Sequence, residues 1–309
     1  MKLWFVGSGS FAALCLTYMS RKLFFDKIVT GCPTTSGRGL EKRPSRVEEA
    51  AVRMGLIVER TGPLSQNEEI MEAISADPPD LIFVVDFGQL IKEPLLNAAR
   101  HGCLNIHPSL LPRWRGAAPI PRALMNGDAV TGVTLFRLTE KMDAGPILRQ
   151  VEIPVDIAAT SDQLYESLAF AGSEIACRGV QSLLDGSCRF LDQNSEFATY
   201  ADKISKTEAQ ISWTQNSLQI HNTVRAFAFS SGAFVVTGGG RLKLWRTLPV
   251  EVAVVGSPGE ILCFIEGEPV VACSYGALRL QEVQAEGRRR MSGADWACGG
   301  RLRAGEVLT

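Results

Sequence analysis

The chain of 309 residues carries 32 lysine and arginine residues against 33 aspartate and glutamate residues, and 46% of it is hydrophobic. This balance excludes a general electrostatic attraction to nucleic acid, and the length allows two domains with their own cores. Because residues 1–25 lack the pattern of a signal peptide and no apolar window reaches about 18 residues, the sequence predicts a soluble, cytoplasmic protein.

Strands and helices alternate from the start of the chain. The apolar run at residues 2–6 predicts a strand, the Ala- and Leu-rich stretch from Phe11 predicts a helix, and residues 27–31 predict a second strand. A further helix is predicted after Ser45, which would form a capping box with Glu48. These units are typical of a sheet with helices on its faces.

The same alternation continues to residue 188. We expect strands at residues 80–88, 103–107 and 131–138, a helix at 93–100, and a long capped helix at 160–186. Strands separated by helices in this way favour a doubly wound arrangement. The first part of the chain is therefore predicted to be an α/β domain with a Rossmann-like, mostly parallel sheet.

The pattern changes in the last third of the chain. Residues 189–206 are polar and are interpreted as a linker. Short β-like runs with glycine turns follow at residues 232–238, 241–248, 259–267, 268–276 and 277–283. Regularly spaced short strands predict a small β-barrel, so we expect domains at residues 1–188 and 207–309.

One strand carries two polar side chains that suit catalysis. Asn105 and His107 are two residues apart, so they share one face near the carboxyl end of the strand, where open α/β sheets bind ligands. An amide and an imidazolium donor would stabilise an oxyanion, and one such donor is worth about 2.7–4 kcal/mol. Asp143, in a glycine-containing loop after the next strand, would orient His107 and keep it protonated. This trio favours acyl transfer, although a lone histidine in a strand is more often structural.

Metal chemistry is disfavoured by the residue inventory. Eight cysteines are scattered without a C-x-x-C pair, and the chain has only three histidines. Structural zinc sites and disulfide frameworks need closely spaced ligands or dense cysteines. We therefore expect neither a metal nor a disulfide.

Residues 7–12, GSGSFA, offer an alternative interpretation. They form a G-x-G-x-x-A pattern, which alone is a weak signal for a dinucleotide-binding oxidoreductase. The acidic residue expected about 20 positions later, which would hold the ribose, is absent. A dinucleotide site is therefore the less favoured hypothesis.

Two loops concentrate positive charge despite the overall balance. A charge run is usually a solvated face, but a basic loop beside an acyl-transfer site suits a phosphate-rich acceptor. The first cluster contains Arg38, Lys42, Arg43 and Arg46, and the second contains Arg288, Arg289 and Arg290.

The order N-x-H-x-S-L-L-P from Asn105, followed by D-A-G at Asp143, resembles the folate-dependent formyltransferases. The resemblance covers nearly the whole chain and is strongest for the members that act on methionyl-tRNA. The segments that carry this finer resemblance are residues 37–45, 109–120, 126–138 and 200–213. The amino-sugar formyltransferases share the N-x-H and D core, so an enzyme acting on a nucleotide-linked amino sugar is the alternative.

The resemblance implies a Rossmann-like domain followed by an OB-like barrel. It implies that 10-formyltetrahydrofolate donates a formyl group to the α-amino group of initiator methionyl-tRNA, with no metal and no obligate protein partner. It assigns catalysis to Asn105, His107 and Asp143, and tRNA binding to the two basic clusters, with the loop at 33–46 near the acceptor stem. The folate residues implied are Phe87, Gly88, Leu90, Ser109, Leu110, Leu111 and Pro112.

Two segments depart from the family pattern. Many members have G-T-P-x-F-A where this chain has GSGSFA at residues 7–12, and a Pro-rich turn where it has AFSSGAF at 228–234. Pro108 also follows the histidine where some members carry Gly or Ala. None of these changes touches Asn105, His107 or Asp143.

Overall fold

The computed structural model describes residues 1–36, 41–250 and 256–308, and it divides into two compact units. The first unit contains Met1–Pro119, Val130–Pro154 and Tyr165–Asp202. The second contains Ile120–Ala129, Val155–Leu164 and the chain from Lys203 onward. The division is thus not a single cut in the sequence, because two short segments of the first 200 residues belong with the second unit.

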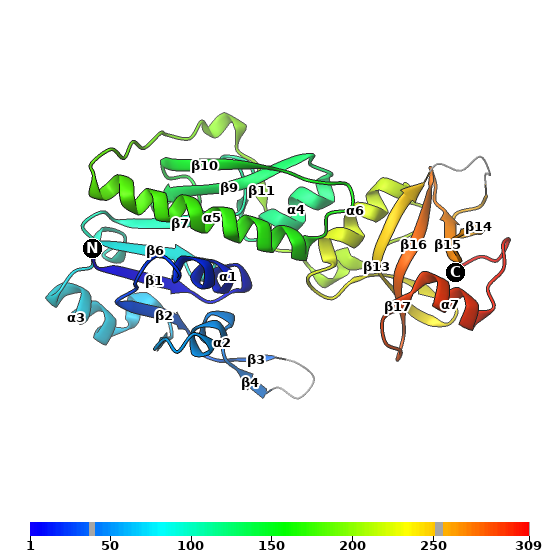
Figure 1. The fold of residues 1–309 in the computed structure, drawn as a ribbon, viewed down its shortest axis with the longest axis horizontal. Coiled ribbons are helices and arrows are strands. Elements are labelled where there is room, and N and C mark those ends of the chain that lie inside the picture. The colour runs from blue at the N-terminus through cyan, green and yellow to red at the C-terminus, as the bar shows by residue number, and fades with distance from the viewer. Residues whose placement is uncertain (37–40, 251–255, 309) are drawn as a thin grey trace. The chain divides into compact units, whose positions relative to one another are not determined.

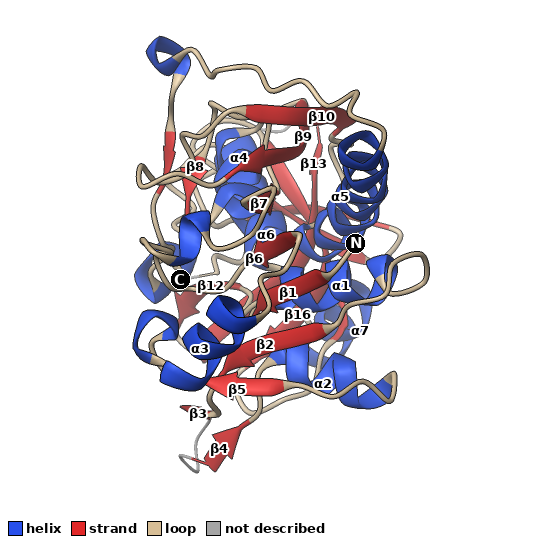
Figure 2. Ribbon diagram, turned by 90° about the vertical axis from the view of Figure 1, so that its left-hand side faces the viewer, coloured by secondary structure: helices blue, strands red, loops and turns tan. Residues whose placement is uncertain are grey.

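A seven-stranded sheet forms the centre of the first unit, in the order β10-β9-β7-β6-β1-β2-β5 (Figures 1 and 2). The five strands from β7 to β5 are parallel, whereas β9 and β10 are antiparallel. This confirms the prediction of a mostly parallel Rossmann-like sheet. The strands are β1 Leu3–Gly7, β2 Lys27–Gly31, β5 Glu59–Thr61, β6 Leu81–Val85, β7 Cys103–His107, β9 Val130–Arg137 and β10 Ile147–Pro154.

Helices cover both faces of this sheet, with α1 and α5 on one face and α3 on the other (Figure 2). Ile70 and Ile74 of α3 pack in one core cluster with Trp4 and Ile82 of the central strands. Strands β1 and β6 are buried along their whole length, as expected of parallel strands covered on two sides. The helices of this unit are α1 Ser10–Met19, α2 Arg46–Arg53, α3 Glu68–Ala76 and α5 Ser161–Leu184.

Two local predictions need correction. The helix predicted at residues 93–100 is wrong, because only a 3-10 turn at Leu95–Asn97 forms there. The backbone N–H groups of Arg100 and His101 donate to the carbonyls of Pro79 and Asp80 rather than to carbonyls four residues earlier, so the helical hydrogen-bond pattern does not continue. At α2 the Ser45 hydroxyl accepts from the Glu48 N–H as predicted, but the Glu48 carboxylate pairs with Arg60, so no capping box closes.

Short elements complete the first unit. β3 pairs with β4 as an antiparallel hairpin, and β8 pairs with β11 in parallel. These elements are β3 Thr34–Ser36, β4 Glu41–Arg43, β8 Arg115–Gly116, β11 Tyr200–Ala201 and the 3-10 turns η1 Leu64–Gln66, η2 Leu95–Asn97 and η3 Ser195–Phe197.

The second unit contains an antiparallel sheet in the order β12-β13-β16-β15-β14, with β17 paired to β16. The short strands expected in this region are confirmed. Its elements are α4 Pro119–Asn126, η4 Lys206–Ala209, α6 Ser217–Phe227, β12 Ala233–Thr237, β13 Gly240–Val250, β14 Ile261–Ile265, β15 Glu268–Ala272, β16 Ala277–Ala285, β17 Met291–Ser292 and α7 Gly293–Gly300. Within the described ranges, every helix is too short or too polar to cross a membrane.

Candidate active site

Strand β7 lies between β6 and β9 and ends at His107. Asn105 pairs with Phe136 of β9, and His107 pairs with Thr134. The two polar side chains therefore lie at the carboxyl end of the parallel strands, the edge where open α/β sheets bind ligands.

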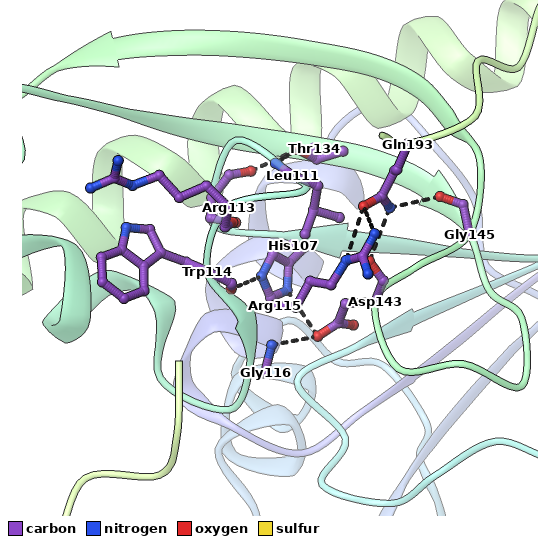
Figure 3. A network of polar contacts seen from close by, with 11 residues as sticks. His107, Leu111, Arg113, Trp114, Arg115, Gly116, Thr134, Asp143, Gly145 and Gln193 are labelled. Carbon is purple, nitrogen blue, oxygen red and sulfur yellow. Dashed lines mark hydrogen bonds and ion pairs between the residues drawn. The ribbon is translucent and has the colours of Figure 1, made fainter. Parts of the chain in front are cut away.

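The imidazole of His107 is buried, with 5% of the residue exposed. Its Nε2 lies 2.8 Å from the carbonyl oxygen of Trp114 (Figure 3). A carbonyl oxygen only accepts, so Nε2 carries a hydrogen and Nδ1 is the nitrogen left for proton exchange. Nδ1 faces Oδ2 of Asp143 at 3.8 Å, which is too long for a direct hydrogen bond. The hydrogen bond at Nε2 therefore fixes the orientation of the ring, and Nδ1 remains available to an atom of a ligand.

Asp143 lies in the loop between β9 and β10. Its Oδ2 accepts from the backbone N–H of Gly116 at 2.8 Å, which holds the side chain in place (Figure 3). Its backbone has φ 50°, which is uncommon for a residue other than glycine. The carboxylate is thus fixed beside His107 by the loop that follows β7.

The side chain of Asn105 makes no hydrogen bond within the part of the chain that the structure describes. Its Oδ1 is buried from solvent and lacks a partner. Buried polar atoms are normally hydrogen-bonded, so an orphaned amide at a sheet edge calls for an explanation. A ligand that supplies the missing contacts provides one.

The loop after His107 is stabilised by hydrogen bonds within the loop and to the neighbouring strands β9 and β10. The Ser109 hydroxyl donates to the Arg113 carbonyl at 2.6 Å, and the Thr134 hydroxyl donates to the Ser109 carbonyl at 2.6 Å. Leu111 donates its N–H to Thr134 and accepts from Gln150 through its carbonyl. The side chains of Ser109 and Leu111 are buried in this loop, so they shape it from within.

The other residues expected at the folate lie in two places. The Phe87 side chain packs in the core next to α3, whereas Leu90 is 57% exposed. Gly88 has φ 76°, which glycine tolerates without strain. Leu110 and Pro112 are half-buried at the site loop. Only Leu90 of the loop at 87–90 therefore presents a large apolar side chain to solvent.

Asp86 explains the GSGSFA departure at residues 7–12. A Cβ added to Gly9 would lie 1.9 Å from Oδ2 of Asp86, so proline or any other side chain there would require the Asp86 carboxylate to move. The carboxylate accepts from the N–H of Phe11 at the start of α1. Because it occupies the helix N-terminus, where a pyrophosphate would bind, it argues against the dinucleotide interpretation.

Desolvation of the Asp86 carboxylate raises its pKa to about 6, although the residue as a whole is exposed. Hydrogen bonds from the N–H groups of Phe11 and Ala12 oppose this shift. Desolvation, which raises the pKa of Asp86, thus has a larger effect than the hydrogen bonds at the helix N-terminus, which lower it.

The first basic cluster is only partly described. Arg38 lies outside the described residues. Lys42 and Arg43 are exposed on β4, and Arg46 is exposed but paired with Glu49 at 2.9 Å. Lys42 and Arg43 thus form the open basic part of this cluster.

The second basic cluster includes an aromatic ring that the sequence analysis missed. Arg288, Arg289 and Arg290 are exposed in the turn between β16 and β17. The guanidinium carbon of Arg290 lies 3.5 Å from the ring centre of Trp245, a cation–π arrangement. Lys243 lies over the same ring at 5.5 Å.

Four residues near these sites were missed by sequence reasoning. Lys243 and Trp245 alternate with apolar residues in the sequence RLKLW, and this period of two could have placed them on one face. Arg115 and Gln193, whose side chains form two hydrogen bonds beside Asp143, carried no such signal, because they are 78 residues apart (Figure 3).

No cluster of three or more His, Cys, Asp or Glu side chains able to hold a metal ion occurs among the residues with a described placement. The three side chains brought together here are an amide, an imidazole and a carboxylate. They suit stabilisation of a tetrahedral oxyanion.

Comparisons with known proteins place both parts of the chain in one family. Residues 1–180 match the family described as formyl transferase, and residues 203–301 match the formyl transferase C-terminal domain. The methionyl-tRNA formyltransferase of Aromatoleum aromaticum is 36% identical over 307 residues, which cover 99% of this chain and 96% of that relative.

Solved structures share the fold at lower identity. An N-formyltransferase from Helicobacter canadensis, in complex with folinic acid and dTDP-3-aminofucose, matches with TM-score 0.63 and 19% identity over 92% of this chain and 98% of that one. HypX from Aquifex aeolicus, in complex with tetrahydrofolic acid, matches with TM-score 0.62 and 18% identity over 96% of this chain. This chain spans 47% of the HypX chain. With both domain matches and the Aromatoleum relative, the chain belongs to the formyl transferase family.

Proposed function

We propose that the protein transfers the formyl group of 10-formyltetrahydrofolate to the α-amino group of initiator methionyl-tRNA, and so acts in translation initiation. The observation that carries this proposal is the nearly full-length match to a methionyl-tRNA formyltransferase in a chain that places Asn105, His107 and Asp143 at one sheet edge. A reaction on charged tRNA would take place in the cytoplasm.

The chemistry follows from the groups present. The neutral α-amine attacks the formyl carbon, a carbon–nitrogen bond forms, and a tetrahedral oxyanion results. The bond to N10 of the folate then breaks, so that the amine loses one proton and N10 gains one. Asn105 Nδ2 and a protonated His107 Nδ1 are the donors to the oxyanion, and each such donor typically contributes about 2.7–4 kcal/mol.

Asp143 acts through His107 in this mechanism. Its carboxylate lies 3.8 Å from Nδ1, the nitrogen that acts as the donor in the proposed mechanism. The hydrogen bond from Gly116 keeps the carboxylate in place. No covalent enzyme intermediate is required, because the acceptor amine is itself the nucleophile.

The donor folate fits the same edge. The orphaned amide of Asn105 offers a polar partner to the formyl group, and Leu90 offers an exposed apolar side chain on the loop at 87–90. We assign Phe87, Gly88, Ser109, Leu110, Leu111 and Pro112 to the folate site as the residues that shape its walls or contribute backbone contacts. Apolar walls with few polar groups are usual for such sites.

We assign tRNA binding to residues 207–309, with an OB-like barrel built on the antiparallel sheet, and the catalytic groups to residues 1–188. Arg288, Arg289 and Arg290 offer cations to the phosphate groups of the tRNA, and the buried Trp245 ring packs against Arg290 through a cation–π contact. Lys42 and Arg43 are the further phosphate-binding candidates, with Arg46 and Arg38 beside them in the sequence.

Formyl transfer from 10-formyltetrahydrofolate tests the proposal directly. Three acceptors are compared: charged initiator tRNA, charged elongator methionyl-tRNA and a nucleotide-linked amino sugar. We expect the highest kcat/KM with the charged initiator tRNA. A higher kcat/KM with the amino sugar would overturn the proposal in favour of a sugar formyltransferase, and equal values with the two tRNAs would remove the initiator assignment.

A further inference from the structure

Residues 189–202 follow helix α5 and run past the candidate site, and we call this segment the strap. At one end the ring of Phe190 lies 4.1 Å from the guanidinium carbon of Arg137, and Leu191 exchanges two backbone hydrogen bonds with Ile147. At the other end β11 pairs with β8, directly after the loop that follows His107. The strap is thus attached to the first unit on both sides of the site.

Gln193 lies in the middle of the strap. Of residues 191–197 it is the only one that is half-buried, and the others are exposed. Its Oε1 accepts from Nε and Nη2 of Arg115 at 3.1 and 2.7 Å (Figure 3). Its Nε2 donates to the carbonyl oxygens of Asp143 and Gly145 at 2.9 and 2.7 Å. All four hydrogen-bonding positions of the amide are therefore used.

This arrangement requires an amide. One side of Gln193 faces a guanidinium, which only donates, and the other faces two carbonyls, which only accept. A carboxylate could satisfy Arg115 but would turn an acceptor toward the two carbonyls. The contacts thus select a side chain with an acceptor and two donors at one end.

Two of the three residues bonded to Gln193, Arg115 and Asp143, belong to the environment of His107. Arg115 is only 4% exposed and follows Trp114, whose carbonyl orients the ring. Asp143 has φ 50°, a conformation that surrounding contacts must maintain. Gln193 binds its carbonyl while Gly116 binds its carboxylate. The amide therefore links the two loops that define the separation of His107 and Asp143.

We propose that Gln193 is a positioning residue for formyl transfer, which keeps the Asp143 carboxylate against His107 by joining the loop at 143–145 to Arg115. The activity measurements below rest on the proposed function, whereas a spectroscopic measurement does not. Since an error of about 1 Å in such a site costs up to about a hundredfold in rate, the expected effect is measurable.

Gln193→Ala and Gln193→Glu test the role, with Gln181→Ala on the exposed face of α5 as a matched control. We expect both Gln193 variants to lower kcat by roughly tenfold or more with KM for methionyl-tRNA changed by less than about twofold. The glutamate variant separates the two halves of the amide, because it retains an acceptor for Arg115 but no donor for the carbonyls. Gln181→Ala should retain the wild-type kcat.

A double-mutant cycle with Asp143→Asn shows whether Gln193 acts through Asp143. If it does, Gln193→Ala should lower kcat by less than about threefold in the Asp143→Asn background, because the carboxylate that it positions is gone. Equal losses in both backgrounds would mean that Gln193 acts elsewhere, and the proposal would be wrong.

Imidazole nitrogen and proton NMR signals provide a measurement without substrate. The chain contains three histidines, so the ring signals can be assigned by substitution. We expect the His107 signals to move in both Gln193 variants while those of His221 stay in place. If the wild-type protein formylates no methionyl-tRNA, the proposed function fails, and this measurement still decides the positioning role.

Thermal unfolding of each variant shows whether it is folded. If Gln193→Ala does not fold, the Gln193→Glu protein, which is similar in size, decides the question by the same measurements. Folded Gln193 variants with wild-type kcat and unchanged His107 signals would overturn the proposal.

Discussion

Two buried histidines, one in each unit, differ in a single contact. His107 at the end of β7 is 5% exposed, and His221 in α6 is 2% exposed. Each places Nε2 on a backbone carbonyl, that of Trp114 at 2.8 Å and that of Ile157 at 2.7 Å. Burial and this first hydrogen bond therefore do not distinguish the proposed catalytic imidazole, His107, from His221.

The second nitrogen makes the distinction. Nδ1 of His221 is hydrogen-bonded to the Thr247 hydroxyl at 3.0 Å, so both ring nitrogens have partners within the fold. Nδ1 of His107 faces the Asp143 carboxylate at 3.8 Å without a closed hydrogen bond. A ring with both nitrogens satisfied stabilises its surroundings, whereas a ring with one nitrogen open beside a carboxylate can serve a substrate.

The largest expected effect comes from removing the second donor beside His107. Asn105→Ala should lower the single-turnover rate of formyl transfer by roughly two orders of magnitude, the usual cost of one oxyanion donor. Because the Asn105 side chain makes no hydrogen bond among the described residues, the fold and tetrahydrofolate binding should persist. A rate within about threefold of wild type would exclude a catalytic role for this amide.

A smaller effect is expected from Lys42 and Arg43, which we propose bind tRNA and take no part in the chemical step. The double variant Lys42→Ala with Arg43→Ala should raise KM for methionyl-tRNA and make the salt dependence of kcat/KM shallower by about one to two in slope, since phosphate contacts release counterions. Steady-state kinetics over a salt series measure this. Replacing the exposed Arg53 and Arg178 by alanine gives a control with the same change in charge. If both double variants behave alike, β4 provides no specific contact.

The pH dependence of stability sharpens the description of His221. Burial lowers its pKa, and the neighbouring Arg225 also contributes. The folded state thus prefers the neutral ring, so this stability is present above the unfolded pKa of about 6.5 and is lost as the pH falls toward the folded value. In chemical denaturation, His221→Gln should lose less stability than wild type between about pH 8 and pH 5. An unchanged acid loss in the variant would contradict the assignment.

Asp86 should show the opposite sign. Its pKa is raised to about 6, chiefly by desolvation, so its contribution is present below the unfolded value near 3.8 and is lost as the pH rises through about 6. Asp86→Asn retains an acceptor for the Phe11 N–H and cannot ionise. The free energy of unfolding should therefore fall less in the variant than in wild type between about pH 4 and pH 8. Parallel curves would show that Asp86 does not titrate in this range.

The sequence predicted the features that repeat with a short period. Alternation and spacing located β7 and placed Asn105 and His107 on one face, and the Ser45 cap of α2 was found from its sequence position. The helix expected at residues 93–100 failed, because the N–H groups of Arg100 and His101 pair with the carbonyls of Pro79 and Asp80, a contact that a local pattern does not reveal.

Contacts between distant segments were beyond such reasoning. Residues 189–206 read as a polar linker, yet Gln193 bonds to Arg115 and to the loop of Asp143. Gly9 read as a departure from a family pattern, and only the fold shows that Asp86 fills the space of a side chain there. A polar residue type alone does not show whether its side chain is solvated or is hydrogen-bonded to other parts of the protein.

The most direct test of the account compares the two histidines in one assay. Single-turnover transfer from 10-formyltetrahydrofolate to charged initiator tRNA is measured for His107→Gln and His221→Gln at saturating enzyme and folate. We expect His107→Gln to be slower than wild type by at least about a hundredfold and His221→Gln to stay within about threefold. A His107→Gln enzyme at full rate, or equal losses in the two variants, would contradict the claim that the open nitrogen of His107 serves the reaction.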